Sequence, residues 1–330
     1  MQHRLAILDD YQGVADGFAD WSSLAADGFA DWSSLAADGV AVTTYREPFS
    51  SPDALESALA DATIIIAMRE RTAFPREVLE KLPALRLLVT TGMANASIDV
   101  AAAADLGITV SGTPGSPTAA PELTWALLLA IARNIPAEDS SLRVGSWQHT
   151  VGFELAGKTL GVVGLGKIGR RIAGYGQAFG MDVLAWSQNL TDEAAAEAGV
   201  RKVSKEELFR NSDVATLHLR LSPRSEGIVG EPELRLLGPD GILVNTARGP
   251  LVDQDALVRA LAEGWIAGAA VDVFDHEPLP AGHPLLSAPN TVLSPHLGYV
   301  TRESYRQFYG GALEDVKAWL AGSPVRVISA

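Results

Sequence analysis

The sequence contains no cysteine, which excludes disulfide bonds and metal sites built on thiolates. Its six histidines show no pairing of the HxxxH kind, so we expect no metal site. No stretch approaches the ~18 apolar residues that cross a bilayer, and the first residues lack the layout of a signal peptide. We therefore expect a cytoplasmic protein without a metal or membrane partner.

Positive charge is also scarce, and the formal net charge is −14. Proteins that bind nucleic acid carry basic faces, so we expect no nucleic-acid partner. An anionic substrate would have to be held by a few placed cations. The rest of the composition, 47% hydrophobic and 20% charged, is that of a globular protein, and 330 residues suit two domains.

Short apolar runs alternate with Ala- and Leu-rich helical stretches along most of the chain. Such runs predict strands buried on both faces, and helices between them predict parallel crossovers. There are too many strands for one compact sheet of this kind, so the sequence predicts an α/β fold with two doubly wound, Rossmann-like parallel sheets. The predicted strands cover residues 5–8, 41–44, 63–67, 87–90, 109–110, 159–163, 182–185, 214–217, 242–245, 269–271 and 291–293.

Two segments rich in proline and glycine, residues 111–117 and 294–298, mark the domain boundaries. We predict a substrate domain formed by residues 1–111 and 297–330, and a dinucleotide-binding domain formed by residues 112–296. The helix expected near 303–320 would pack back on the first domain. The helix near 121–132 is too apolar to be solvated all round, so we expect it in the interface of a homodimer.

One segment occurs twice in tandem. Residues 15–25 read ADGFADWSSLA, and residues 26–36 repeat the same letters. Repeat architectures need longer periods and more copies, so this is not a solenoid. We expect a tolerated surface insertion without a function.

A glycine-rich loop, GLGKIG, stands between a predicted strand and a predicted helix. In this context Gly164 makes the tight turn, Gly166 lets a pyrophosphate approach the backbone, and Gly169 lets the helix pack on its strand. Backbone amides at the start of the helix, at Lys167 and Ile168, would bind the phosphates. The loop therefore predicts a dinucleotide site.

The next strand is followed by Ser187, Gln188 and Asn189, where the chain should read the adenosine ribose. An acidic residue there indicates NAD and an arginine indicates NADP, and this sequence has neither. The choice between NAD and NADP stays open.

Three further segments each follow a predicted strand: NTARGPLVD at 245–253, DVFDHEPL at 272–279 and SPHLG at 294–298. Ligands of open α/β sheets bind at the edge where the strands end. Together with the glycine-rich loop, these segments resemble the D-isomer-specific 2-hydroxyacid dehydrogenase family, and the resemblance covers about residues 87–320. It implies an oxidoreductase that moves a hydride between a nicotinamide cofactor and a 2-keto acid/D-2-hydroxy acid pair, of the glyoxylate, hydroxypyruvate or phosphoglycerate type.

The resemblance also implies the catalytic residues Arg248, Glu277 and His296. Their chemistry suits the reaction, because Arg248 can hold a carboxylate and polarise a carbonyl, while Glu277 can stabilise a protonated His296 that donates the proton.

The same resemblance places His218 and Asp272 beside the cofactor, with Asp272 on the nicotinamide carboxamide. It gives the backbone amides of Met93 and Ala94 to the substrate carboxylate.

Two other functions remain open for this fold. Formate dehydrogenase pairs its histidine with a glutamine, so Glu277 favours hydroxy-acid chemistry, whereas phosphite oxidation keeps a similar triad. The alternative from another class is a non-catalytic NAD(H)-sensing binding protein. The sequence does not identify the substrate.

Overall fold

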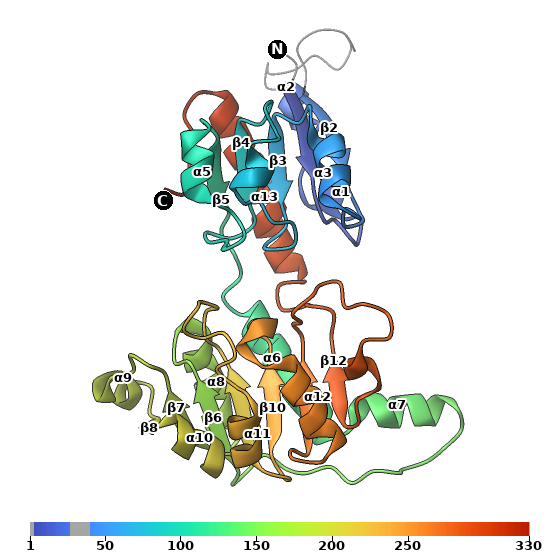
Figure 1. Ribbon diagram of the computed structural model, residues 1–330, viewed down its shortest axis with the longest axis vertical. Helices are drawn as coiled ribbons and strands as arrows, with labels where there is room; N and C mark the ends of the chain where they lie inside the picture. Colours follow the sequence, from blue (N-terminus) through green and yellow to red (C-terminus); the bar gives the residue numbers. More distant parts are fainter. Residues whose placement is uncertain (1–2, 27–39, 330) are drawn as a thin grey trace. The chain divides into compact units, whose positions relative to one another are not determined.

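The computed structural model describes residues 3–26 and 40–329, which fall into two compact α/β units. One unit comprises Met1–Ser116 and Val300–Ala330, and the other comprises Pro117–Tyr299. Each contains one parallel sheet with helices packed on it (Figure 1), which confirms the predicted fold class. No helix in the described part of the chain is both long enough and apolar enough to cross a bilayer.

The first unit has a five-stranded sheet in the order β2-β1-β3-β4-β5. Its strands are β1 (His3–Ile7), β2 (Val40–Thr44), β3 (Ile64–Ala67), β4 (Leu87–Thr90) and β5 (Thr109–Gly112). Its helices are α1 (Ala15–Phe18), α2 (Ser23–Ala26), α3 (Pro52–Leu59), α4 (Arg76–Leu79), α5 (Val100–Asp105) and α13 (Arg302–Leu320).

The second unit has a seven-stranded sheet in the order β12-β11-β10-β9-β6-β7-β8. Its strands are β6 (Thr159–Val163), β7 (Asp182–Trp186), β8 (Arg201–Lys202), β9 (Val214–Leu217), β10 (Ile242–Asn245), β11 (Gly268–Val271) and β12 (Thr291–Leu293). Its helices are α6 (Ala119–Ala132), α7 (Ile135–Arg143), α8 (Lys167–Ala178), α9 (Asp192–Glu197), α10 (Lys205–Asn211), α11 (Glu231–Leu237) and α12 (Gln254–Ala262), with short 3₁₀ turns at Gly249–Leu251 and Pro284–Ser287.

Alternate residues of each central strand of the second unit enter two different cores. In β6, Val162 packs in the core that contains residues of α6 and α8, whereas Val163 packs in the core that contains residues of α10, α11 and α12. In β10, Val244 and Leu243 divide in the same way. Because both faces of these strands are buried, their interior positions are apolar, and the polar residues stand at the ends, as Thr159 in β6 and Asn245 in β10. The apolar runs predict the sheet.

Three helices of the second unit, α9, α10 and α12, begin at a side-chain cap. Asp253 accepts from the Ala256 amide at the start of α12. Ser204 and Glu207 form a reciprocal capping box at the start of α10. Each cap satisfies amides that the first turn of a helix leaves without a partner.

The units divide a few residues later than the sequence predicts, at 116/117 and 299/300 rather than 111/112 and 296/297. Backbone hydrogen bonds explain the difference. Gly112 and Thr113 donate to Arg326 and Thr90, which holds this segment on the first unit. Leu297 and Gly298 donate to the Asp272 carboxylate, which holds that segment on the second unit.

The first copy of the tandem repeat packs on the first unit, whereas the expectation of a tolerated insertion, which named neither copy, stays a prediction. Ala15, Trp21 and Leu24 are buried, at 1%, 5% and 0% exposure. Trp21 makes an edge-to-face ring contact with Tyr309 of α13 and donates to the Ala15 carbonyl. The segment alternates aromatic and small residues that fit against α13, a tertiary contact that the local pattern does not reveal. Residues 27–36 of the second copy lie outside the described residues.

Candidate active site

The glycine-rich loop joins β6 to α8, and each glycine occupies a different environment. Gly164 has a φ of +103°, which other residues rarely adopt, and a Cβ there would lie 2.8 Å from the His218 carbonyl oxygen. A Cβ at Gly169 would lie 2.0 Å from the Gly164 carbonyl oxygen. At Gly166 a Cβ would meet nothing within 4 Å. The first and third glycines are therefore required by the chain itself, and the second leaves open space that suits a pyrophosphate.

The N-terminus of α8 provides the complementary charge. Its cap residue, Gly166, has no side chain, so the first amides receive no side-chain cap. The side chains of Lys167 and Ile168 are exposed beside them. Uncapped amides and the partial positive charge of a helix N-terminus attract phosphate, so these residues fit a dinucleotide.

Ser187 follows β7 directly and is half-buried, whereas Gln188 and Asn189 are exposed. The Gly164 amide donates to the Trp186 carbonyl at 2.8 Å, which places the end of β7 beside the glycine-rich loop. Ser187 therefore lies where the ribose would be read, and it carries no charge to select NAD or NADP.

His218 follows β9 and adjoins the same loop, because its amide donates to the Val163 carbonyl at 2.8 Å. Its Nε2 lies 3.0 Å from Thr216 Oγ1. Burial lowers the pKa of His218 to about 3, so the imidazole is neutral at ordinary pH. A neutral ring beside the dinucleotide loop can hydrogen-bond a cofactor but does not supply a charge.

Arg248 lies in the loop that follows β10. Its Nη1 donates to the Ala247 carbonyl at 2.6 Å, and the side chain is half-buried. Gly249 crosses the neighbouring loop so closely that a Cβ would lie 2.2 Å from the Phe274 carbonyl carbon. This glycine lets the Arg248 loop approach the loop that carries Glu277.

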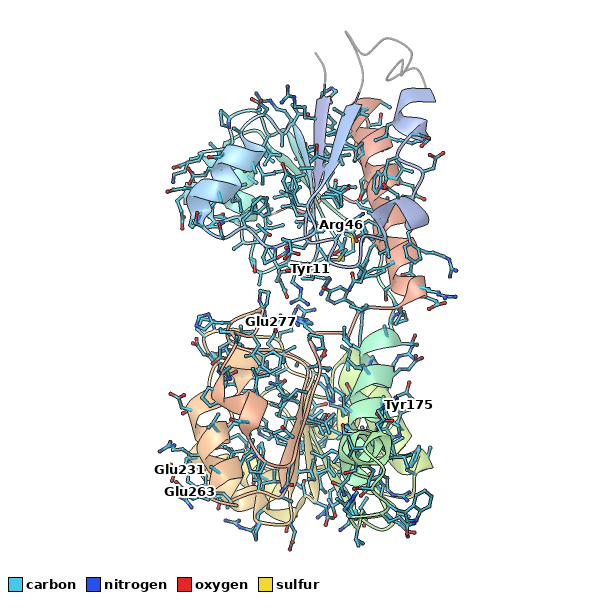
Figure 2. All side chains as sticks on the ribbon, turned by 90° about the vertical axis from the view of Figure 1, so that its right-hand side faces the viewer. Tyr11, Arg46, Tyr175, Glu231, Glu263 and Glu277 are labelled. Carbon is cyan, nitrogen blue, oxygen red and sulfur yellow. The ribbon has the colours of Figure 1, made fainter. Side chains whose placement is uncertain are left out.

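Glu277 and His296 form a pair of side chains. His296 Nδ1 lies 2.5 Å from Glu277 Oε2, and the other carboxylate oxygen accepts from the Phe274 amide at 2.8 Å. The side chains of His296 and Glu277 are only 17% and 19% exposed. Because a carboxylate only accepts, His296 Nδ1 carries the proton of this bond. Figure 2 shows Glu277 at the opposite end of the second unit from Glu231 and Glu263.

Asp272 is fully buried and holds the loop that carries His296. Its carboxylate accepts from the Ser294 hydroxyl at 2.5 Å, the Leu297 amide at 2.7 Å and the Gly298 amide at 3.0 Å. Burial raises the pKa of Asp272, and these hydrogen bonds oppose that shift. His296 itself has a φ of +53°, so its backbone conformation depends on such support. The role implied by the resemblance, contact with a nicotinamide, stays a prediction.

The loop after β4 belongs to the first unit, and it contains Met93 and Ala94, both exposed. Asn95 donates to the Thr90 hydroxyl at 2.9 Å, and the Gly92 amide donates to the Thr113 hydroxyl at 2.9 Å. These bonds bracket the two exposed residues. The loop therefore presents a fixed backbone at the position given to the substrate carboxylate.

Among the residues that the structure describes, no group of three or more His, Cys, Asp or Glu side chains could hold a metal ion. Asn245 and Ser294 also take part in the hydrogen bonds of these loops, and neither was predicted to have a role. Each is a polar residue that ends or directly follows a buried strand, and this position is the feature of the sequence that could have indicated a role.

Comparison with known proteins identifies the family. The model for the D-isomer specific 2-hydroxyacid dehydrogenase, NAD binding domain, matches residues 125–298. The chain belongs to this family. The glyoxylate reductase of Aeropyrum pernix is 43% identical over 256 residues, which cover 74% of this chain and 76% of that protein. That of Thermococcus litoralis is 41% identical over 239 residues, 69% of this chain and 72% of that protein. The crystal structure of the phosphoglycerate oxidoreductase of Vibrio cholerae has a TM-score of 0.88 at 37% identity, and the match covers 97% of this chain and 100% of that one.

The predicted family is thereby confirmed. The chain is an oxidoreductase that transfers a hydride between NAD or NADP and a pair of acids, a 2-hydroxy acid and the matching 2-keto acid.

Proposed function

We propose that this family member interconverts a small 2-keto acid and its D-2-hydroxy acid, with glyoxylate and hydroxypyruvate as the first substrates to test. The observation that carries the proposal is the His296–Glu277 pair, which lies beyond the ends of β11 and β12. Relatives that are 43% and 41% identical to this chain over 256 and 239 aligned residues are named glyoxylate reductase, which supports a small substrate.

The proposed roles follow from the chemistry of each side chain. The nicotinamide cofactor supplies or accepts the hydride when bound. Arg248 binds the substrate carboxylate and polarises the carbonyl. In reduction, the proton on His296 Nε2 moves to the carbonyl oxygen, which becomes the hydroxyl, while Nδ1–H stays bonded to Glu277. In oxidation, neutral His296 takes that proton back.

Steady-state kinetics test the proposal. We expect turnover of glyoxylate, hydroxypyruvate, pyruvate or phenylpyruvate with NADH or NADPH, and a loss of roughly 10³-fold or more in Arg248→Ala. Binding of NADH without turnover of any keto acid would instead support the NAD(H)-sensing alternative. Full activity in Arg248→Ala would contradict the role given to that residue.

We also propose a cytoplasmic homodimer. The sequence bases the dimer on the apolar helix near 121–132, and the support given below comes from a different surface. Helix α6 buries Trp125, Leu128 and Ile131 within its own unit, so its apolar character alone does not require a partner. Helix α7 has no buried residue.

Exposed apolar side chains gather on α7 and the segment after it. Ile135, Leu142, Val144, Trp147 and Val151 are 55%, 56%, 81%, 75% and 96% exposed. Apolar exposure on this scale is typical of an interface. A second copy of this chain presents the same apolar surface, so the two copies can cover each other. Sedimentation should give a dimer, and Trp147→Asp combined with Val151→Asp should shift it towards the monomer. A parent protein that is monomeric at micromolar concentration would contradict this proposal.

A further inference from the structure

Asn245, the last residue of β10, ends the strand with a side chain that turns back onto the next loop. The residue is 2% exposed. Its carbonyl oxygen Oδ1 accepts from the Ala247 amide at 3.1 Å, and its Nδ2 donates to the Arg248 carbonyl at 2.9 Å. One side chain therefore holds two backbone groups of the segment that carries Arg248.

These two bonds stand on either side of the peptide group that contacts the Arg248 guanidinium. That group is the Ala247 carbonyl, which accepts from Arg248 Nη1 at 2.6 Å. With the Ala247 N–H and the Arg248 C=O both held by Asn245, the intervening peptide plane has little freedom to rotate. The carboxamide therefore restrains the direction of the Ala247 carbonyl, which is one acceptor of the Arg248 guanidinium.

The rest of the loop is held by other contacts that do not reach this peptide group. Thr246 Oγ1 lies 2.6 Å from Thr124 Oγ1 of α6, whose own proton goes to the Ala120 carbonyl. Gly249 packs on the backbone of Phe274. Both contacts fix the ends of the loop, and Asn245 alone among these residues bonds to both Ala247 and Arg248.

The chemistry requires an amide at this position. A side chain of this length must donate to one carbonyl and accept from one N–H, and only asparagine carries both groups in a neutral form. Aspartate could accept but not donate, and alanine could do neither, which would leave buried backbone groups without partners.

We infer that Asn245 is a positioning residue of the reaction, which orients the Arg248 guanidinium for the substrate carboxylate. The inference rests on the proposed role of Arg248. It predicts that the two residues are coupled: removing the Asn245 side chain should lower kcat/KM mainly when Arg248 is present.

A double-mutant cycle on the full-length protein tests this claim. Asn245→Ala should lower kcat/KM for the keto acid by about 30- to 100-fold, since a misplaced binding group costs on this order. The dissociation constant for NADH, measured by fluorescence, should stay within about threefold, because Asn245 contacts none of the residues of the dinucleotide loop. In an Arg248→Ala background the same substitution should change kcat/KM by less than about threefold.

Two further variants keep the test decisive. Asn245→Leu keeps a similar side-chain volume but loses both the acceptor for Ala247 and the donor to Arg248, so it should also lower kcat/KM in the parent background only. Ser212→Ala is the matched control, because it removes a buried bond from Ser212 to the Leu208 carbonyl, next to the start of β9 rather than the ends of the strands. It should lower the thermal midpoint without lowering kcat/KM.

The outcomes separate the two claims. An equal loss in both backgrounds, or no loss in the parent, would overturn the role of Asn245 while the proposed function stands. Parental activity in Arg248→Ala would overturn the role of Arg248 on which this inference rests, and absence of keto-acid turnover in the parent protein would overturn the proposed function itself.

Discussion

Replacing Glu277 by glutamine tests the acid–base pair most directly. The carboxylate presents two acceptor oxygens to two N–H donors, those of His296 and of the Phe274 amide. A glutamine amide has the same shape but only one acceptor. Either one of the two bonds is lost, or the imidazole adopts the neutral tautomer whose Nδ1 accepts from the glutamine NH2. The negative charge that stabilises a protonated His296 disappears in either case.

The size of the effect follows from this geometry. Two opposite unit charges about 4 Å apart attract by about 4 kcal/mol at the effective dielectric constant of about 20 that suits protein sites. Desolvation of a pair whose side chains are 17% and 19% exposed offsets part of this attraction. Losing this attraction disfavours the protonated imidazole, so we expect the rate profile of Glu277→Gln to move to lower pH.

The direction of the shift differs in a testable way between the two reactions. Reduction needs protonated His296, so its rate falls as pH rises, and in Glu277→Gln this fall should begin at lower pH. Oxidation needs neutral His296, and its activity should persist to lower pH. The measurement is kcat/KM in both directions from about pH 5 to about pH 9. Glu207→Gln is the control, since it removes one charge from the cap of α10. If the profile of Glu277→Gln coincides with that of the parent, Glu277 has no part in proton transfer.

Three other perturbations have defined outcomes. Deleting residues 15–25 gives the same chain as deleting residues 26–36, because the copies are identical, so one copy stays available to pack on α13. Activity and the thermal midpoint of the deletion variant should therefore hardly change. Loss of activity in a folded variant would contradict this prediction. The neutral pocket at Ser187 should discriminate between NADH and NADPH by less than about a hundredfold in kcat/KM, as one or two uncharged hydrogen bonds allow. Ser187→Asp should shift the preference towards NADH, and a parent already selective beyond about a thousandfold would implicate another residue such as Arg220. Burial raises the pKa of Asp315 to about 7 although Arg326 pairs with it, so the folded protein keeps a proton that the unfolded chain releases. As pH rises from the ordinary pKa of an aspartate to this raised pKa, the free energy of unfolding should fall by up to ~1.4 kcal/mol per pH unit. In Asp315→Asn the thermal midpoint should depend less steeply on pH. A dependence as steep as that of the parent would contradict the assignment.

Most of the fold follows from local sequence pattern. Strands such as β6 and β10 are buried on both faces, so their apolar runs are continuous and easily recognised. The short edge strand β8, Arg201–Lys202, consists of two exposed residues and has no such pattern. The packing of the first copy of the repeat has no local pattern either, because its aromatic rings contact Tyr305 and Tyr309, almost 300 residues away in the sequence.

The family resemblance names Arg248, Glu277 and His296, and each of the three follows a strand of the seven-stranded sheet. Their pairing is a further step, since Glu277 and His296 follow different strands, β11 and β12, which only the parallel order of the sheet brings together. The position of Asp272 illustrates the limit. An acid at the end of a strand predicts a contact with a ligand, but the sequence does not show that the chain 22 to 26 residues later folds back to donate three hydrogen bonds to it.

Three polar side chains at or beyond strand ends share one feature that explains this ambiguity. Asp272, Asn245 and Glu277 each accept from at least one backbone amide of a neighbouring loop. In each case a nearby residue, His296 or Arg248, carries the group that suits the chemistry. The ends of the strands therefore need two kinds of polar residue, one that acts on the substrate and one that holds the loop. Composition alone does not separate them, because both kinds are buried or half-buried and polar. Accounting for the backbone groups that each side chain satisfies does separate them, and it assigns Asn245 to the second kind.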